Sequence, residues 1–185
     1  MDSTQDPRRR LVDGNALFRK AVDPTTLARL AKGQAPFIAI LTCSDSRVSP
    51  CKIFNLSLGE AFVVRVAGNC ATDPGVLGSI EYAVLHLNVR VVLVMGHTDC
   101  GAVKASFTCE DRGNLEAVMK DLECARSKLP KERERDPDAV AESNVRIQMR
   151  RVQDFNPDIR ELVRQGKLEV LGAMFDIVSG AVRFI

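Results

Sequence analysis

Residues 91–95 read Val-Val-Leu-Val-Met and lead directly into Gly96-His97-Thr98-Asp99-Cys100-Gly101. An unbroken apolar run of this length is the size of one β-strand, and it indicates a strand that is buried on both faces. Residues 37–41, Phe-Ile-Ala-Ile-Leu, form a second run of this kind and precede Cys43-Ser44-Asp45-Ser46-Arg47. Both predicted strands therefore end close to a short cluster of sulfur-bearing and polar side chains.

Strand and helix patterns alternate along the rest of the chain. We expect strands over residues 37–41, 61–66, 89–95 and 168–175, and helices over 11–31 with a break at Asp23-Pro24, 74–87, 114–128, 139–155 and 157–165. Buried strands that alternate with helices predict an α/β fold in which helices flank a mainly parallel sheet. Because no repeat or low-complexity linker interrupts the pattern, we expect a single domain over residues 1–185.

Composition and charge exclude several classes of partner. Lys and Arg number 26 against 24 Asp and Glu, and this net charge of +2 leaves no basic surface for nucleic acid or an anionic membrane. No apolar run approaches the roughly 20 residues that cross a bilayer. The six cysteines are too few and too irregularly spaced for a disulfide framework, and no signal peptide follows Arg8-Arg9-Arg10. We therefore expect a cytoplasmic protein that acts on a small molecule.

The two clusters together provide a ligand set for zinc. Cys43 and His97 each lie two residues beyond a predicted strand, and Cys100 follows His97 by three residues. Ligand sites in open α/β sheets form at the carboxyl ends of parallel strands, so these side chains are expected to meet there. A structural zinc site closes the metal with four protein ligands, whereas a catalytic site uses three. Two thiolates and one imidazole thus predict one catalytic Zn²⁺ per chain.

Three motifs in this order resemble the β-class carbonic anhydrases. They are Cys43-Ser44-Asp45-Ser46-Arg47, then Arg65-x-Ala67-Gly68-Asn69, then Gly96-His97-x-x-Cys100-Gly101. Residues 78–83, Gly-Ser-Ile-Glu-Tyr-Ala, and the ending from Gly172 to Gly180 are also similar to that family, so the resemblance covers most of the chain. The short length is similar to the compact archaeal and bacterial branch. The resemblance implies a β-carbonic anhydrase-like fold.

The resemblance also implies an activity and assigns residues to it. The enzyme would be a carbonate dehydratase, a zinc lyase that reversibly hydrates carbon dioxide to bicarbonate and a proton by zinc-bound hydroxide. Cys43, His97 and Cys100 would bind the zinc. Asp45 and Arg47 would form the catalytic dyad: Asp45 accepts a hydrogen bond from the water or hydroxide and orients it, and Arg47 keeps Asp45 ionised.

In the family, loss of the pair formed by Asp45 and Arg47 lets the aspartate bind zinc and close the site. Bicarbonate-controlled switching is associated with an anion pocket that combines an arginine with a tryptophan three residues before the first ligand. Arg65 fits the arginine, but Ile40 occupies the tryptophan position and the chain contains no Trp. We therefore expect a constitutively open site.

Two other functions share these ligands. Relatives with this fold hydrolyse carbon disulfide or carbonyl sulfide, and the ligand set does not separate those substrates from carbon dioxide. A zinc-binding regulator or scaffold without turnover is the second alternative, although a purely structural site has no need for Asp45 and Arg47. A zinc finger or a thioredoxin-like redox protein is not expected, because Cys-x2-Cys pairs are absent.

Other polar residues receive structural interpretations. We expect His86 to be a packing residue, although a role as proton carrier stays open. Asp99 either caps the following helix or contacts the ligands from behind, and Gly68-Asn69 forms a turn or borders the substrate. The remaining cysteines are expected to be structural thiols; they are Cys51, Cys70, Cys109 and Cys124.

The resemblance predicts a homodimer or a dimer-based higher oligomer. In the family, N-terminal helices wrap the partner subunit and the substrate cleft lies at the interface. Here residues 1–35 would form that helical arm and residues 36–185 the α/β core. The arm carries apolar residues among its charges, namely Leu11, Val12, Leu17 and Phe18.

Overall fold

The computed structural model describes residues 6–108 and 113–185, and the chain divides into two compact units on either side of the boundary between Gln34 and Ala35. The first unit consists of α1 (Pro7–Ala21) and α2 (Pro24–Leu30). Asp6 and Asp23 cap these helices by accepting hydrogen bonds from the backbone N–H groups of Arg8 and Thr25. The break at Asp23-Pro24 therefore lies where the sequence predicts it. That the two units form a single domain stays a prediction.

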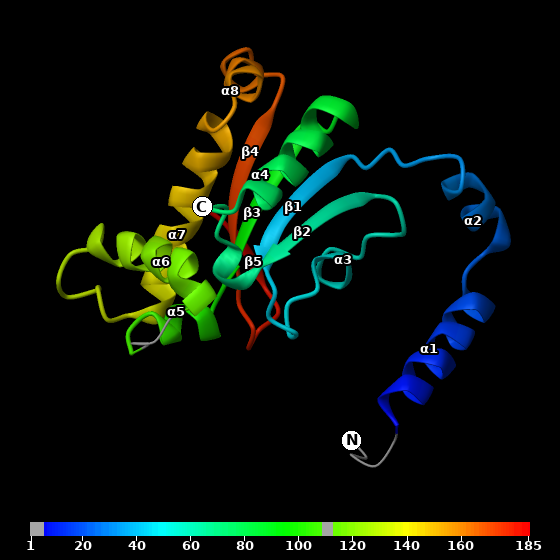
Figure 1. Cartoon of the computed structure of the whole chain (residues 1–185), viewed down its shortest axis with the longest axis horizontal. Helices are drawn as coiled ribbons and strands as arrows, with labels where there is room; N and C mark the ends of the chain where they lie inside the picture. Colours follow the sequence, from blue (N-terminus) through cyan, green and yellow to red (C-terminus); the bar gives the residue numbers. More distant parts are fainter. Residues whose placement is uncertain (1–5, 109–112) are drawn as a thin grey trace. The chain divides into compact units, whose positions relative to one another are not determined.

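The second unit is built on a five-stranded sheet in the order β2-β1-β3-β4-β5 (Figure 1). Its strands are β1 (Ile38–Cys43), β2 (Ala61–Val66), β3 (Val91–His97), β4 (Glu169–Phe175) and β5 (Val182–Phe184). The first four strands pair in parallel and β5 pairs antiparallel with β4. The predicted α/β fold with a mainly parallel sheet flanked by helices is confirmed.

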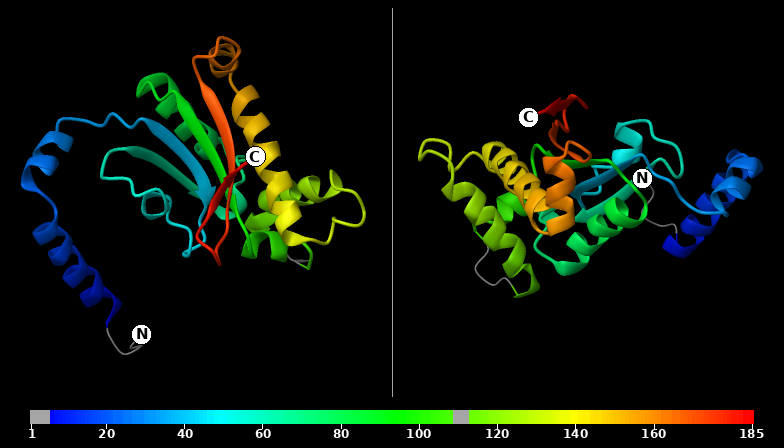
Figure 2. Two further views of the ribbon diagram at one scale, coloured as in Figure 1. Left: turned by 180° about the vertical axis from the view of Figure 1, so that it is seen from behind. Right: turned by 90° about the horizontal axis from the view of Figure 1, so that it is seen from above.

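Helices cover the two faces of the sheet unequally. On one face, the larger core lies between the strands and three helices: α4 (Pro74–Glu81), α6 (Glu116–Ser127) and α7 (Pro137–Asp154). On the other face, a smaller cluster around Ile40 and Leu93 is covered mainly by α3 (Pro50–Ile53) and the residues after it. Figure 2 shows α4 and α6 on one side of the strands and α3 and β5 on the other. The site residues lie at one end of this sheet, where β1 and β3 finish.

Several bounds differ from the prediction. β1 and β3 run two residues further than expected, so Cys43 and His97 are the last residues of their strands. The helix expected over 74–87 is α4 followed by the π-helical turn η2 (Tyr82–His86). Two short elements, α3 and β5, were not predicted, because segments of three or four residues are too short to show a clear periodicity. The helix expected after Asp99 is α5 (Gly101–Ala105).

The remaining elements connect these layers. They are η1 (Ala67–Asn69), η3 (Gly113–Leu115) and α8 (Pro157–Arg164). None of the helices in residues 6–108 and 113–185 is long and apolar enough to cross a bilayer.

Helix α7 packs unusually close to β3 because the strand has no side chain at Gly96. A Cβ atom there would lie 2.7 Å from Cγ2 of Val145 and 3.0 Å from Sδ of Met174, which is closer than side chains approach. Glycine therefore allows α7 to lie against the end of β3. This packing places the first turn of α7 beside the residues that follow His97.

Candidate metal centre

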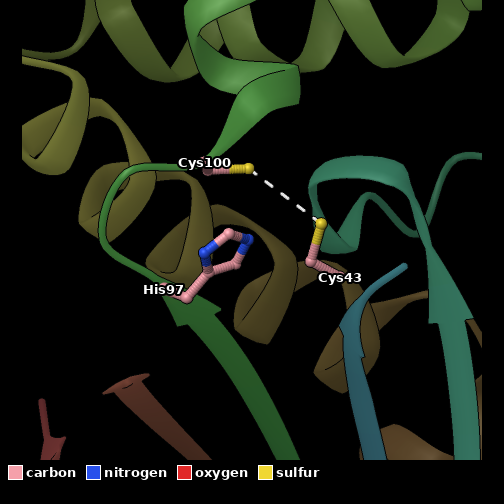
Figure 3. Close-up of side chains that lie close together, drawn as sticks. All are labelled: Cys43, His97 and Cys100. Carbon is pink, nitrogen blue, oxygen red and sulfur yellow. Dashed lines mark hydrogen bonds between the residues drawn. The ribbon is translucent and has the colours of Figure 1, made fainter. Parts of the chain in front are cut away.

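Three potential ligands converge at the ends of β1 and β3. Cys43 and His97 end adjacent parallel strands, and Cys100 follows after a short turn. One ligand atom from each of these residues lies within 4.8 Å of the other two, and the sulfurs of Cys43 and Cys100 are 4.0 Å apart. In Figure 3 the imidazole faces the two sulfurs. The sequence motifs, 57 residues apart between the cysteines, thus come together in space.

The turn between His97 and Cys100 depends on an unusual backbone conformation. Asp99 has a φ of 58°, in the left-handed region that Gly, Asn and Asp adopt most readily. This turn reverses the chain so that Cys100 points back toward His97. Cys100 is the N-cap residue of α5, and no side chain caps that helix. Asp99 therefore does not cap α5, which was one of its two predicted roles.

His97 presents an unpaired nitrogen to the sulfurs. Its side chain is fully buried, and Nδ1 lies 2.8 Å from the backbone carbonyl oxygen of Thr98. Nδ1–H donates to that carbonyl, which leaves the lone pair on Nε2. Within the described residues, Nε2 is buried and has no hydrogen-bond partner. A buried polar atom without a partner is costly, whereas this same arrangement is the one that metal-binding histidines use.

The two thiols are buried and electrostatically coupled. Cys43 is 4% exposed and Cys100 is 3% exposed. The hydrogen bond from Cys100 lowers the pKa of Cys43, and the same interaction together with burial raises the pKa of Cys100. Thiolates rather than thiols bind metals, so the lowered pKa of Cys43 favours the form that binds a cation. Two sulfurs and one imidazole nitrogen are soft and borderline donors that suit Zn²⁺, and the site fits the metal.

Asp45 lies at the edge of the ligand cluster and is paired with Arg47. Nε and Nη2 of Arg47 donate to the two carboxylate oxygens of Asp45 at 3.0 and 2.7 Å, and the backbone N–H of Arg47 donates at 2.9 Å. These hydrogen bonds hold the pKa of Asp45 well below its usual range, so the carboxylate stays ionised. Oδ2 of Asp45 lies 3.9 Å from Nε2 of His97. The dyad therefore directs one ionised oxygen toward the cluster.

Arg47 also contacts the turn that follows His97. Nη1 donates to Oδ2 of Asp99 at 2.8 Å, and Nη2 donates to the Asp99 carbonyl at 3.0 Å. Lys104 pairs with the other carboxylate oxygen of Asp99, and the Asp99 N–H donates to Asp138 at 2.9 Å. The sequence did not indicate Lys104 or Asp138. Lys104 follows Asp99 by five residues on α5, but Asp138 is 39 residues away and carries no local signal.

Arg65 braces the backbone of the Cys43 cluster. Its Nε donates to the Cys43 carbonyl at 3.2 Å, and Nη2 donates to the Asp45 carbonyl at 2.7 Å. Ile40, at the position compared with tryptophan, is fully buried on the α3 face of the sheet. Arg65 thus stabilises the backbone conformation of the loop that begins at Cys43.

A buried polar network supports the segment from Gly68 to Ala71 behind Cys43. Asn144 on α7 donates to the Gly68 carbonyl at 2.7 Å, and Gln148 accepts from the Ala71 N–H at 2.9 Å. Gln148 in turn donates to Asp121 at 3.0 Å, and Arg151 forms an ion pair with Asp121. The sequence did not indicate these four residues. Amide and carboxylate side chains at single helix positions look like ordinary surface residues until the fold buries them.

The remaining predicted residues are not part of the ligand group. Gly68 has a φ of 63°, so Gly68-Asn69 does form a turn, and Asn69 is 3% exposed. His86 is exposed and stacks on Tyr82 with 5.5 Å between ring centroids, which agrees with packing. Cys51, Cys70 and Cys124 are free thiols outside the ligand group, and burial raises the pKa of Cys70 to about 12. Cys109 lies outside the described residues.

Comparisons with known proteins agree on one family. The family model described as Carbonic anhydrase matches residues 38–182. A carbonic anhydrase of Synechococcus elongatus is 33% identical over 94% of this chain and 70% of its own length. A β-carbonic anhydrase structure from Aspergillus fumigatus superposes with a TM-score of 0.87 at 28% identity, covering 97% of this chain and 91% of that one. A tetrameric β-carbonic anhydrase from Sordaria macrospora superposes with a TM-score of 0.83 at 32% identity, covering 96% and 95%.

Proposed function

Because this chain belongs to the β-class carbonic anhydrases, a family of enzymes, we propose that it catalyses the reversible hydration of carbon dioxide to bicarbonate and a proton. We assign one Zn²⁺ per chain to Cys43, His97 and Cys100. The observation that supports this most directly is the buried, unpartnered Nε2 of His97 facing two sulfurs, with an ionised carboxylate beside it. The cluster offers three ligands in the described residues, the number that catalytic zinc sites use.

Zinc held by these ligands would lower the pKa of a water molecule and so supply hydroxide to attack carbon dioxide near neutral pH. Asp45 then has one task. An ionised carboxylate only accepts hydrogen bonds, so Asp45 would accept one from the O–H of the attacking group. This hydrogen bond would orient a lone pair of the attacking oxygen toward the substrate. Arg47 keeps Asp45 ionised by donating a hydrogen bond to each of its two carboxylate oxygens. Orientation of this kind accelerates a reaction without any new covalent step.

We infer that the site stays available to substrate across the working pH range. Arg47 pairs with both oxygens of Asp45, and Ile40 supplies no aromatic or polar group for an anion pocket. Preincubation with bicarbonate at about pH 7 should therefore leave the initial rate unchanged, since Ile40 offers the anion no partner that would help it to break the pair of Asp45 and Arg47.

We infer an assembly of two or more subunits in the cytoplasm. The relative from Sordaria macrospora is tetrameric, and the arm of this chain exposes large apolar side chains, with Leu11 75% and Leu17 67% exposed. Apolar surface of this kind is typical of interfaces. The free thiols Cys51 and Cys124 are compatible with a reducing compartment.

The test is stopped-flow carbon dioxide hydration, followed with a pH indicator at about pH 8.5, on protein that elemental analysis shows to carry about one zinc per chain. Fast turnover that a small anion such as azide inhibits would support the proposal. No turnover despite full zinc loading would overturn it, and carbon disulfide and carbonyl sulfide would then be assayed on the same samples. Inactivity toward all three would leave a zinc-binding scaffold.

A further inference from the structure

We propose that Asp99 is a positioning residue, whose carboxylate fixes the guanidinium of Arg47 and so holds Asp45 in the orientation that catalysis needs. The inference rests on the proposed function of Asp45, but it concerns a residue to which neither the motif nor the ligand set gives a role. Asp99 is not one of the three metal ligands, and we assign it no contact with the substrate. It acts through Arg47.

The contacts of Arg47 show how the fixation works. A guanidinium has five N–H donors in one plane, and here Nε, Nη1 and Nη2 are all engaged. Two of these nitrogens point to Asp45, and Nη1 points to Oδ2 of Asp99. The plane is thereby fixed at both ends. Arg47 ties the loop after β1, which carries Asp45, to the turn after β3, which carries His97 and Cys100.

Exposure makes the second carboxylate necessary. The side chains of Arg47 and Asp99 are 43% and 49% exposed, so water competes for every donor of the guanidinium. A single exposed ion pair contributes about 0 to 1 kcal/mol and would hold Arg47 only part of the time. Two carboxylates that share one guanidinium restrict it much more strongly, because any rotation of the guanidinium then breaks two ion pairs at once.

Asp99 is itself held in place from several directions. Lys104 on α5 pairs with Oδ1, which leaves Oδ2 for Arg47. The Asp99 N–H donates to Asp138 in the first turn of α7. The close packing of α7 on Gly96 fixes that turn relative to β3. Asp99 is thus an anchored carboxylate rather than a mobile surface side chain.

A simpler interpretation is that Asp99 only permits the left-handed turn. Asn and Gly also adopt a positive φ, so each can replace Asp99 without straining the backbone. Neither offers Arg47 a carboxylate. If the charge of the carboxylate matters, Asp99→Asn and Asp99→Gly should both be defective. If only the backbone matters, both should behave like the unaltered enzyme.

The experiment measures turnover and anion binding on the variants and on a matched control. Glu161 on α8 pairs with two nitrogens of Arg164, and its side chain is 47% exposed, close to that of Asp99. Glu161→Gln therefore removes a similar exposed carboxylate far along the sequence from the site motifs and should change neither measurement. Both Asp99 variants should keep about one zinc per chain and lose about tenfold in kcat with KM within about twofold, as expected for the loss of a charge-assisted hydrogen bond.

Azide titration of the cobalt(II)-substituted protein, read from its visible spectrum, gives a second result that does not depend on turnover. Oδ2 of Asp45 already lies 3.9 Å from Nε2 of His97, so a less restrained carboxylate competes for the space that azide would take. Azide affinity should fall by about tenfold in both Asp99 variants. In a protein that already carries Arg47→Lys, Asp99→Asn should not lower the azide affinity further, because the two residues act through the same contact.

Two results would overturn the inference. One is a pair of variants that bind azide and turn over like the unaltered enzyme. The other is a defect in Asp99→Asn of equal size in the presence and absence of Arg47. A wild-type protein without carbon dioxide hydration would defeat the proposed function instead, and the azide titration would still decide the role of Asp99.

Discussion

Two arginine–carboxylate networks in this protein differ in burial. In the first, Arg47 joins Asp45 and Asp99 with side chains that are 43%, 15% and 49% exposed. In the second, Arg151 joins Asp121 with side chains that are 30% and 8% exposed. The same chemistry is therefore placed once at the surface beside the ligand cluster and once between α6 and α7. The difference indicates that the exposed network orients a catalytic group, whereas the buried network holds helices together.

Energetics support this division. An exposed ion pair adds little stability, so its removal leaves the fold almost unchanged. A buried pair behaves otherwise, because removal of one partner leaves a desolvated charge and unpaired donors behind. Gln148 and Asn144 extend the buried network to the Gly68–Ala71 segment. Substitutions in the two networks test whether function and stability separate in this way.

The largest effect is expected from the ligand cluster that the exposed network serves. Cys43→Ala removes one of the two sulfur ligands. The zinc content should fall below about 0.1 zinc ion per chain, because the two remaining protein ligands bind the metal weakly. Carbon dioxide hydration should disappear with the metal. Elemental analysis and stopped-flow assays on one preparation check both. A variant that kept a full complement of zinc would show that the ligands were assigned wrongly.

The exposed network should affect rate without affecting stability. Asp45→Asn keeps the size of the side chain but loses its charge, and we expect zinc to be retained while kcat falls about 100-fold, the scale of losing one orienting hydrogen bond in an active site. The melting temperature should change by no more than about 2 °C, since Arg47, the partner of the lost charge, is exposed and water can solvate it. Calorimetry and stopped-flow kinetics measure the two effects. Full activity would remove Asp45 from the proposed chemistry.

The buried network should show the opposite pattern. Asp121→Ala leaves Arg151 without its carboxylate and should lower the free energy of unfolding by about 3 kcal/mol, or the melting temperature by about 6 to 12 °C. Activity per folded, zinc-loaded molecule should be unchanged. Asp121→Asn, which still accepts hydrogen bonds, serves as the milder control. If Asp121→Ala instead lowered kcat without lowering stability, the comparison between the two networks would fail.

Much of the exposed site was predictable because it is local in sequence. Asp45 and Arg47 are two residues apart, and His97 and Cys100 are three apart, so short motifs record their chemistry. Apolar runs placed the strands that carry them, and parallel pairing brings strand ends together. The fold class followed from the same runs. The strand ends were misplaced by two residues, because Thr42 and Gly96 are not apolar yet continue the ladder.

The buried network was not predictable, and the reason is physical. Asp121 and Arg151 are 30 residues apart, and Asn144 reaches Gly68 across 76 residues. Their polarity suggested solvent exposure, because burial of such side chains is worthwhile only when every partner is present at once. Asp138 was not predicted for the same reason, because its contact with the Asp99 N–H exists only after α7 packs on β3.

The smallest predicted effect tests whether the two regions are independent. Asn144 donates to the Gly68 carbonyl, and the Gly68 backbone N–H contributes to the lowered pKa of the Cys43 thiol. The end of the buried network is thus one peptide away from a zinc ligand. Asn144→Ala should lower the free energy of unfolding by about 1 to 2 kcal/mol, the value of one buried hydrogen bond, and leave kcat unchanged.

The same variant should lose zinc to a chelator about two- to fivefold faster, because the Gly68 peptide is then free to move away from the Cys43 sulfur, and groups that contact a metal ligand affect how well the metal is retained. Ser143→Ala is the matched control. It removes a side-chain hydrogen bond of 2.8 Å from the neighbouring position of α7, but that bond goes to the Ala125 carbonyl on α6. Ser143→Ala should lower stability by a similar amount and leave the rate of zinc loss unchanged. Equal rates in both variants would mean that the buried network serves stability alone, whereas a faster rate only in Asn144→Ala would mean that it also supports the metal ligand.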